Sequence, residues 1–195
     1  YSVEALEDLY DINISYYAQI NFSGFMALVD AVGGVVVNSD VSFSSGGDHF
    51  YVGKNYLNGQ QALRFARARK QFAGGDHVRG RNQMKVIQGL IDKLSAGTIL
   101  TNYSRILDSV KGMFATNMPQ EKIAELVKMQ LDDMAKWTVK SYAVTGENGS
   151  GKTYSIPSMT VYIMLPHEEK VEYASGLIER VLKGEILTDA DLKGK

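Results

Sequence analysis

Apolar residues recur at the three- and four-residue spacing of an amphipathic helix along most of the chain, whereas strand-like stretches are few and short. This spacing predicts helices over residues 2–10, 23–32, 76–97, 103–115, 119–135 and 168–183, with Ser2 and Ser23 as candidate caps and Gly33 and Gly34 as a stop. Another helix is predicted to start at Asn58, which has the spacing of a capping box to Gln61. Strand candidates lie at 35–37, 137–145 and 158–165. Helices that alternate with a few short strands are typical of a layered domain, so we expect an α/β fold.

Composition excludes several classes of site and partner. The 195 residues include no cysteine, which excludes disulfides, thiolate nucleophiles and cysteine-bound zinc or iron–sulfur centres. No apolar run approaches the roughly 18 residues that cross a bilayer. The formal net charge of -1 does not by itself indicate a nucleic-acid or membrane-surface protein.

The arginines, however, are concentrated in one short segment. Five of the seven lie within residues 64–81, namely Arg64, Arg67, Arg69, Arg79 and Arg81. Together with Lys70, and opposed there only by Asp76, they give this segment a net charge of +5, which leaves −6 for the rest of the chain. The near-neutral total therefore conceals a compact cationic segment.

The spacing of these residues suggests that they converge. Arg67 and Arg69 are two residues apart, which places them on one side of an extended segment. Asp76, Arg79 and Gln83 follow at spacings of three and four, so a helix that begins at Asp76 carries them on one face. Guanidinium groups bind phosphate oxygens in pairs and stay charged, so converging arginines predict a site for a compact polyanion such as a diphosphate.

Two other interpretations of the cationic segment stay open, a solvated basic face and a nucleic-acid surface. A solvated face does not explain the choice of arginine, because 13 of the 14 lysines lie outside the segment. A nucleic-acid surface requires a broader basic face with aromatic residues for stacking, and Phe65 and Phe72 are the only aromatic residues in the segment. We favour the phosphate site and expect no nucleic-acid partner.

A second candidate phosphate motif lies near the end of the chain. Residues 146–153 read GENGSGKT and match the phosphate-binding loop of nucleotide-binding proteins. That loop must lead directly into a helix, and Pro157 would break such a helix in its first turns. Only 42 residues follow Thr153, too few for the rest of a nucleotide-binding domain. We therefore predict that this stretch is a glycine-rich hairpin between two strands.

Several motifs occur in order and together resemble those of the LytR–CpsA–Psr family. They are NFSGF at 21–25, LVDAVGGV at 28–35, GQQALRFARAR at 59–69, GD at 75–76 and RGRNQ at 79–83. The resemblance covers about residues 1–170 and is strongest to the streptococcal capsule-attachment members. It implies a three-layer α/β/α sandwich with a central mixed sheet, of which residues 1–185 form the C-terminal part. Residues 186–195 are expected to be a frayed polar tail.

The resemblance also implies a function. Members of this family are phosphotransferases on the outer face of the membrane of Gram-positive bacteria. They move a glycopolymer, such as capsular polysaccharide or teichoic acid, from a polyprenyl diphosphate carrier to peptidoglycan, with magnesium as the cofactor. The alternative, from another functional class, is a non-enzymatic regulator or attenuator of cell-wall or capsule synthesis.

Site residues are implied by position in the family motifs. The diphosphate-binding residues are Arg67, Arg69, Arg79 and Gln83, the catalytic residues are Asp76 and Arg79, and Arg81 is a weaker candidate because the motif varies there. We expect no metal ligand in this chain. The magnesium ligands and the membrane anchor are expected in an N-terminal part of the family domain, carried by a separate or longer chain. Residues 1–195 alone would then bind diphosphate weakly and lack catalysis.

Overall fold

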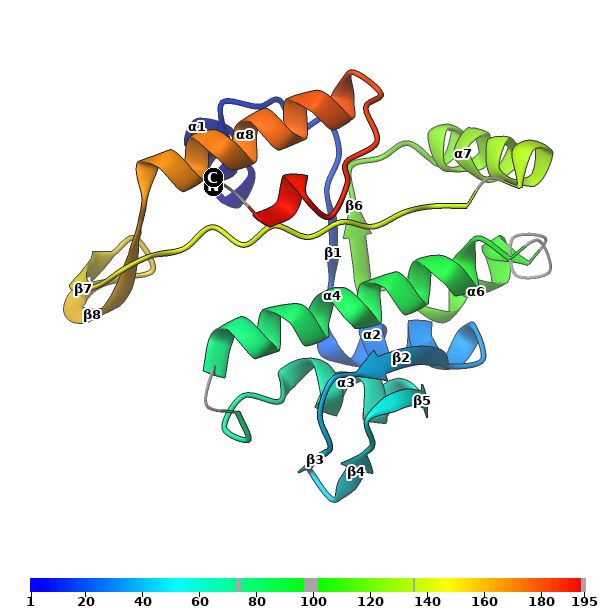
Figure 1. Cartoon of the computed structure of the whole chain (residues 1–195). Coiled ribbons are helices and arrows are strands. Elements are labelled where there is room, and N and C mark those ends of the chain that lie inside the picture. The colour runs from blue at the N-terminus through cyan, green and yellow to red at the C-terminus, as the bar shows by residue number, and fades with distance from the viewer. Residues whose placement is uncertain (73–74, 97–101, 135, 194–195) are drawn as a thin grey trace. The chain divides into compact units, whose positions relative to one another are not determined.

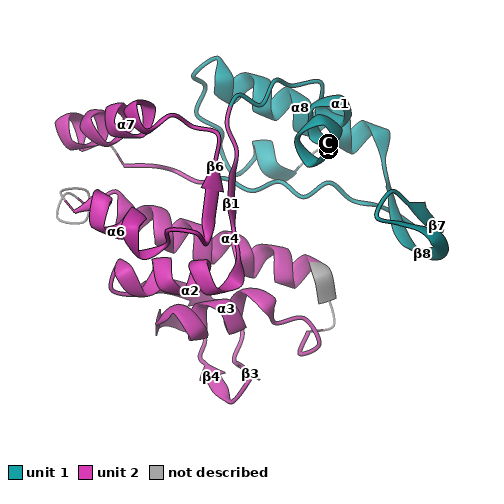
Figure 2. Ribbon diagram, turned by 180° about the vertical axis from the view of Figure 1, so that it is seen from behind, with its two compact units in different colours: residues 1–15, 140–195 teal, residues 16–139 magenta. Residues whose placement is uncertain are grey.

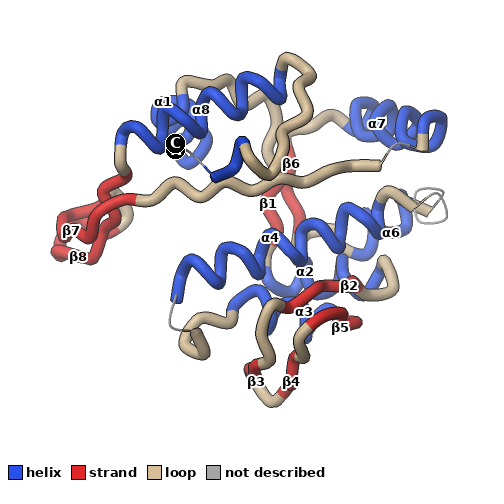
Figure 3. Tube along the Cα trace, in the orientation of Figure 1, coloured by secondary structure: helices blue, strands red, loops and turns tan. Residues whose placement is uncertain are grey.

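The chain forms two compact units of mixed α/β structure. The computed structural model describes residues 1–72, 75–96, 102–134 and 136–193. Unit 1 comprises residues 1–15 and 140–195, and unit 2 comprises residues 16–139 (Figure 2). The α/β class expected from the sequence is confirmed. The described strands pair only antiparallel, in four two-stranded sheets, and helices account for most of the regular structure (Figure 3).

Unit 2 contains most of the described helices and three of the sheets (Figure 1). Its elements are β1 (Ala18–Ile20), α2 (Phe22–Ala31), β2 (Val35–Ser39), β3 (Phe43–Ser45), β4 (Asp48–Phe50), β5 (Gly53–Leu57), α3 (Gly59–Arg67), α4 (Gly75–Leu94), α6 (Tyr103–Ser109), β6 (Phe114–Thr116) and α7 (Gln120–Asp133). Strand β1 pairs with β6, β2 with β5 and β3 with β4.

The transition from α2 to β2 follows directly from the sequence. Asn21 caps α2, because its side chain accepts a hydrogen bond from a backbone N–H of the first turn. Gly33 and Gly34 follow the helix with φ values of +77° and +81°, a backbone conformation that favours glycine. Val35 and Val37 then enter the core as alternate residues of β2.

The core of unit 2 is formed by side chains of α2, α3, α4 and the short strands. The rings of Phe43, Phe50 and Phe65 lie 4.9–5.4 Å apart between centroids. Helix α4 packs directly on β2, since a Cβ added to Gly89 would lie 2.8 Å from the backbone oxygen of Val36. Helix α3 packs against both α2 and α4. The core therefore fixes α3 between two other helices.

Some helix boundaries differ from the sequence-based predictions. The helix predicted over 103–115 ends at Ser109 in α6, and its last residues belong to β6. Gly112, with a φ of +77°, lies between the two elements and interrupts the helical pattern. Ser2 and Ser23 do not cap α1 and α2, because Tyr1 and Asn21 hold the N-cap positions.

Unit 1 contains two helices, a long hairpin and a short 3₁₀ turn among its described residues. They are α1 (Ser2–Tyr10), β7 (Gly146–Thr153), β8 (Ile156–Pro166), α8 (Glu168–Leu182) and η1 (Asp191–Lys193). Helix α1 packs against α8. Only Ala174, Leu177 and Leu187 are buried among the residues of this unit that the structure describes. Unit 1 therefore has a much smaller core than unit 2.

The glycine-rich segment 146–153 is itself a strand. It pairs along β8, from Gly146 opposite Pro166 to Gly151 opposite Val161 (Figure 1). A hairpin is present as predicted, but residues 146–153 form its first strand and not the connection between two strands. The strand predicted over 137–145 is wrong, because that stretch has no strand partner among the described residues. A strand directs its backbone N–H groups to its neighbour and does not form a phosphate-binding loop. The nucleotide-binding interpretation is therefore excluded.

The segment that follows α8 contacts the helix in its described part. Leu187 is buried, and Nη1 of Arg180 lies 2.9 Å from Oδ1 of Asp191. The backbone N–H and the hydroxyl of Thr188 donate to Oδ2 of Asp191 at 2.7 and 2.6 Å. Residues 186–193 thus make defined contacts with one another and with α8, and the frayed polar tail over 186–195 stays a prediction.

These contacts make the attachment of residues 186–193 dependent on pH. Hydrogen bonds from Thr188, and next from Arg180, lower the pKa of Asp191 from 3.8 to about 2. A lowered carboxyl pKa stabilises the folded state above the unfolded pKa, and this contribution is lost as the pH falls through about 2. Hydrogen exchange of residues 186–193, corrected for its intrinsic pH dependence, should therefore accelerate between pH 4 and 2. Asp191→Asn should show faster exchange already at pH 7, and unchanged protection in this variant would contradict the assignment.

Candidate functional site

Helix α3 begins with a reciprocal cap and ends with two arginines. Oδ1 of Asn58 accepts the backbone N–H of Gln61 at 2.9 Å, and Oε1 of Gln61 accepts the N–H of Asn58 at 3.1 Å. This capping box was predicted from the sequence and is confirmed. Arg64 and Arg67 lie in the last turn, where the partial negative charge of the helix end favours cations.

Arg64 belongs to the scaffold of unit 2. Its Nη1 lies 2.6 Å from Oδ2 of Asp48, and both side chains are partly buried. The same side chain covers Gly46, where an added Cβ would lie 2.8 Å from Nε of Arg64. The sequence identified only Asp76 as an opposing charge, because no local pattern connects Arg64 with an acid 16 residues earlier. The charge of Arg64 is therefore paired with the Asp48 carboxylate within unit 2.

Arg67 and Arg69 flank a buried alanine. Ala68 is 2% exposed and extended, with φ −60° and ψ 124°. Both arginines are exposed. The guanidinium carbon of Arg67 lies 4.6 Å from the centroid of the Phe22 ring. The backbone N–H of Arg69 donates to Oε1 of Gln71 at 3.1 Å.

Helix α4 supplies the second group of candidate residues. Arg79 and Gln83 are four residues apart and therefore lie on the same side of the helix. Gln83 is exposed and Arg79 is partly exposed, whereas Val86 and Leu90 are buried. Asp76 lies in the first turn of α4, and its side chain is outside the part of the chain that the structure describes.

The two groups lie at the same end of the α3–α4 pair. Helix α3 packs against α4, and the start of α4 follows the end of α3 after seven residues, on the same side of unit 2 in both views (Figures 1 and 2). The residues after α3 therefore lie beside the first half of α4. We call Arg67, Arg69, Arg79 and Gln83 the arginine site.

Arg81 lies on another side of α4. Two residues along a helix correspond to a rotation of about 200°, so Arg81 faces away from Arg79. Arg81 and Asn82 line a hollow of about 340 Å³ together with residues 39–42 and Phe72. Asn82 is 5% exposed, and its Nδ2 atom has no hydrogen-bond partner among the described residues. On helix α4, Arg81 thus points away from Arg79, and it stays the weaker candidate of the predicted site residues.

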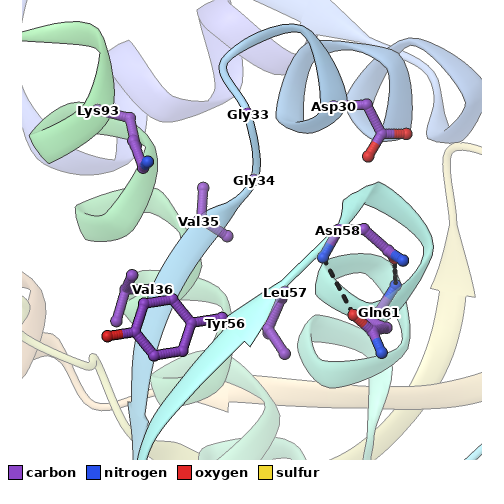
Figure 4. A pocket seen from close by; sticks show the side chains of 10 residues that line it. All are labelled: Asp30, Gly33, Gly34, Val35, Val36, Tyr56, Leu57, Asn58, Gln61 and Lys93. Atoms are coloured by element: carbon purple, nitrogen blue, oxygen red, sulfur yellow. Dashed lines mark hydrogen bonds between the residues drawn. The ribbon is translucent and has the colours of Figure 1, made fainter.

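A second hollow, of about 350 Å³, is lined by no arginine among the described residues (Figure 4). Lys93 of α4 and Asp30 of α2 face it from opposite sides, and β2 and β5 contribute the side chains between them. Lys93 lies 14 residues from Arg79, which is about 21 Å along the helix. One lysine opposite one carboxylate does not match the charge of a diphosphate, so the arginine site remains the candidate.

The described residues do not fit a magnesium site. Within residues 1–72, 77–96, 102–134 and 136–193, whose side chains the structure describes, no three acidic, histidine or cysteine side chains lie close enough to hold a metal ion. In the same part of the chain, no helix is long and apolar enough to cross a membrane. The predicted metal ligands and anchor therefore stay predictions about other segments.

Comparisons with known proteins relate the chain to one family. The model of the LytR_cpsA_psr family matches residues 1–171. A protein of Bacillus cereus (strain AH820), named polyisoprenyl-teichoic acid–peptidoglycan teichoic acid transferase TagU, is 40% identical over 131 residues, which are 67% of this chain and 43% of that protein. The chain thus spans less than half the length of the curated relatives that it matches.

Solved structures have a similar fold. The crystal structure of B. subtilis TagU matches 96% of this chain and 73% of its own, with a TM-score of 0.69 and 25% identity. A Listeria innocua protein matches 93% of this chain and 73% of its own, with a TM-score of 0.74 and 29% identity. These matches support the α/β fold over nearly the whole length of the chain.

Proposed function

The chain belongs to the LytR–CpsA–Psr family, and on that premise we propose that its arginine site binds the diphosphate of a polyprenyl-linked glycopolymer. The observation that carries this proposal is the pair of exposed arginines, Arg67 and Arg69, at the end of α3, which packs against the helix that carries Arg79. Guanidinium groups on two segments suit the two phosphates of a diphosphate.

The proposed reaction of the complete protein is transfer of the glycopolymer to peptidoglycan outside the cell. Its support is the printed name of the TagU relative, which describes transfer of polyisoprenyl-linked teichoic acid to peptidoglycan. Teichoic acid and capsular polysaccharide are both suitable polymers, because the arginine site would contact the diphosphate that such carriers share. An N-terminal part of the family domain, in a longer or separate chain, would complete the active site. Residues 1–195 alone would not catalyse transfer.

The chemistry is a substitution at phosphorus. A hydroxyl oxygen of peptidoglycan forms a bond to the phosphorus that carries the polymer, and the bond from that phosphorus to the polyprenyl phosphate breaks. Negative charge then accumulates on the leaving phosphate, where Arg67, Arg69 and Arg79 would stabilise it. The amide of Gln83 would donate a hydrogen bond to a phosphate oxygen. Asp76, in the first turn of α4, would orient an arginine or assist in removing the hydroxyl proton.

Magnesium is proposed as the cofactor of the complete protein. When bound, it would neutralise part of the diphosphate charge and polarise the phosphorus–oxygen bonds. We assign its ligands to the N-terminal part of the family domain, as the family resemblance implies. The steps assigned to the arginine site do not depend on where these ligands lie.

An exchange of Arg69 for alanine tests the enzymatic proposal. In the complete protein, Arg69→Ala should lower the rate of polymer transfer at least about tenfold, because a charge-assisted hydrogen bond to the diphosphate is lost. The measurement is transfer of labelled lipid-linked polymer to peptidoglycan. Lys70→Ala is the matched control, since it removes an exposed neighbouring cation and the same charge.

The outcome separates the alternatives. Unchanged transfer by a folded Arg69→Ala protein would contradict the role of Arg69 in the arginine site, whereas absence of transfer by the unchanged complete protein would favour a non-enzymatic regulator of cell-wall synthesis. Equal losses in Arg69→Ala and Lys70→Ala would indicate a general basic surface instead of a specific site. Thermal unfolding of each variant shows whether the fold is intact.

A further inference from the structure

We propose that Phe22 is a positioning residue for Arg67, whose guanidinium it holds in place for the diphosphate. This inference rests on the proposed function of the arginine site. The contact that carries it is the 4.6 Å distance between the guanidinium carbon of Arg67 and the centroid of the Phe22 ring. This distance is within the range of a favourable cation–π interaction.

Phe22 does not belong to the core formed by the described residues. The side chain is 58% exposed at the first residue of α2, although a phenylalanine is ordinarily buried. Among the described residues, its ring has no aromatic partner, whereas Phe43, Phe50 and Phe65 contact one another in the core. The ring of Phe22 instead lies under a cation of the arginine site.

The kind of contact matters for ligand binding. An aromatic ring attracts a cation without accepting its N–H groups as a carboxylate does, so the donors and the positive charge of Arg67 stay available. Arg64 shows the contrast, because its guanidinium is paired with the Asp48 carboxylate. The Phe22 ring would therefore hold Arg67 with its donors free for an anion, whereas the Asp48 carboxylate pairs with Arg64 within the fold of unit 2.

The position of Phe22 is itself fixed by the start of α2. The backbone N–H of Asn21 donates to the oxygen of Met113 at 3.1 Å, and the Asn21 side chain accepts the N–H of Gly24 at 2.8 Å. A Cβ added to Gly24 would lie 2.7 Å from Met113 and 2.9 Å from Ile20. The first turn of α2 is thus held against the chain next to β1 and β6, which fixes the backbone that carries Phe22.

A second contact sets the spacing between α2 and α3. Oδ1 of Asp30 accepts the backbone N–H of Gly59 at 2.7 Å. Phe22 precedes Asp30 by eight residues on α2, and Arg67 follows Gly59 by eight residues on α3. Both intervals correspond to about 12 Å of helix. The two helices run antiparallel, joined by Asp30–Gly59 at one end and by Phe22–Arg67 at the other.

The test measures binding of inorganic diphosphate to the 195-residue chain by isothermal titration calorimetry. Phe22→Leu keeps an apolar side chain but removes the ring, and it should raise the dissociation constant about two- to fivefold. Phe22→Tyr keeps the ring face and should bind like the unchanged chain. Tyr56→Leu is the matched control, because Tyr56 is 77% exposed and contacts no arginine among the described residues.

A spectroscopic signature tests the contact directly. In the unchanged chain and in Phe22→Tyr, the ring current should shield the Nε–H resonance of Arg67, which is assigned by its loss in Arg67→Ala. In Phe22→Leu this resonance should move to the position of the other exposed arginines. A role of Phe22 in stability alone would lower the midpoint of thermal unfolding and leave diphosphate affinity unchanged.

Each contrary result has its own meaning. If Phe22→Leu binds diphosphate normally while Arg67→Ala binds at least about tenfold more weakly, the positioning role is wrong and the proposed function stands. If Phe22→Tyr binds as weakly as Phe22→Leu, the ring face does not position Arg67 and the inference also fails. If Arg67→Ala binds normally, the diphosphate site itself is wrong and the role of Phe22 fails with it.

Discussion

Gly59→Val is expected to lower the free energy of unfolding of unit 2 by about 3 kcal/mol. A Cβ at this position would lie 2.2 Å from the backbone oxygen of Met26, a distance that no side chain tolerates. Helices α2 and α3 would have to separate, and the hydrogen bond from the Gly59 N–H to Asp30 would break. Urea unfolding followed by circular dichroism measures the loss.

Gly80→Ala is the matched control in the same unit. No heavy atom lies within 4 Å of a Cβ added there, and Gly80 is inside helix α4. The exchange should raise the free energy of unfolding by about 0.5–1 kcal/mol, because alanine loses less conformational entropy in a helix. If Gly59→Val unfolded at the same urea concentration as Gly80→Ala, the close contact between α2 and α3 would be contradicted.

Local signals predicted much of the fold because they act between residues close in sequence. The capping box of Asn58 and Gln61 involves residues three apart, and it marked the start of α3 correctly. Gly33 and Gly34 marked the end of α2 in the same way, since their positive φ values stop a helix. In each case, one turn of backbone contains all of the interacting atoms.

The β7–β8 hairpin shows where local signals fail. Glycine and polar residues have low strand propensity, so the stretch 146–153 had no strand pattern of its own. It is a strand because β8, which is rich in β-branched and aromatic residues, pairs along it. Residues 137–145 had the better pattern, but they have no partner strand among the described residues. Strand pairing, which neither stretch reveals in its own sequence, determines that residues 146–153 form a strand and residues 137–145 do not.

The candidate site was only partly predictable for a similar reason. The spacing of Arg67 and Arg69 indicated a shared direction, and burial of Ala68 between them accounts for their exposure. The partners of the arginines were missed, because Asp48 is 16 residues from Arg64 and Phe22 is 45 residues from Arg67. The family motif that contains Phe22 was the only signal that could have identified it. These two contacts depend on how α2, α3 and β4 pack.

Exchanging Arg67, Arg69 and Arg79 together for lysine should weaken binding of inorganic diphosphate about hundredfold. The variant keeps the net charge of +5 in residues 64–81. A lysine contacts an oxygen at one point, whereas an arginine can bind two oxygens at once, so a site built on paired contacts loses affinity. Calorimetry at one fixed salt concentration measures this loss, with Arg105→Lys on α6 as the control for an exposed arginine outside the site.

The same variant separates the three interpretations of the cationic segment. Binding of a single-stranded oligonucleotide depends chiefly on charge, so a nucleic-acid surface would keep its affinity in the lysine variant. A solvated basic face would bind diphosphate with the same affinity before and after the exchange. Loss of diphosphate binding at constant charge would instead show that guanidinium geometry is required, which explains why the segment contains five of the seven arginines and only one of the 14 lysines.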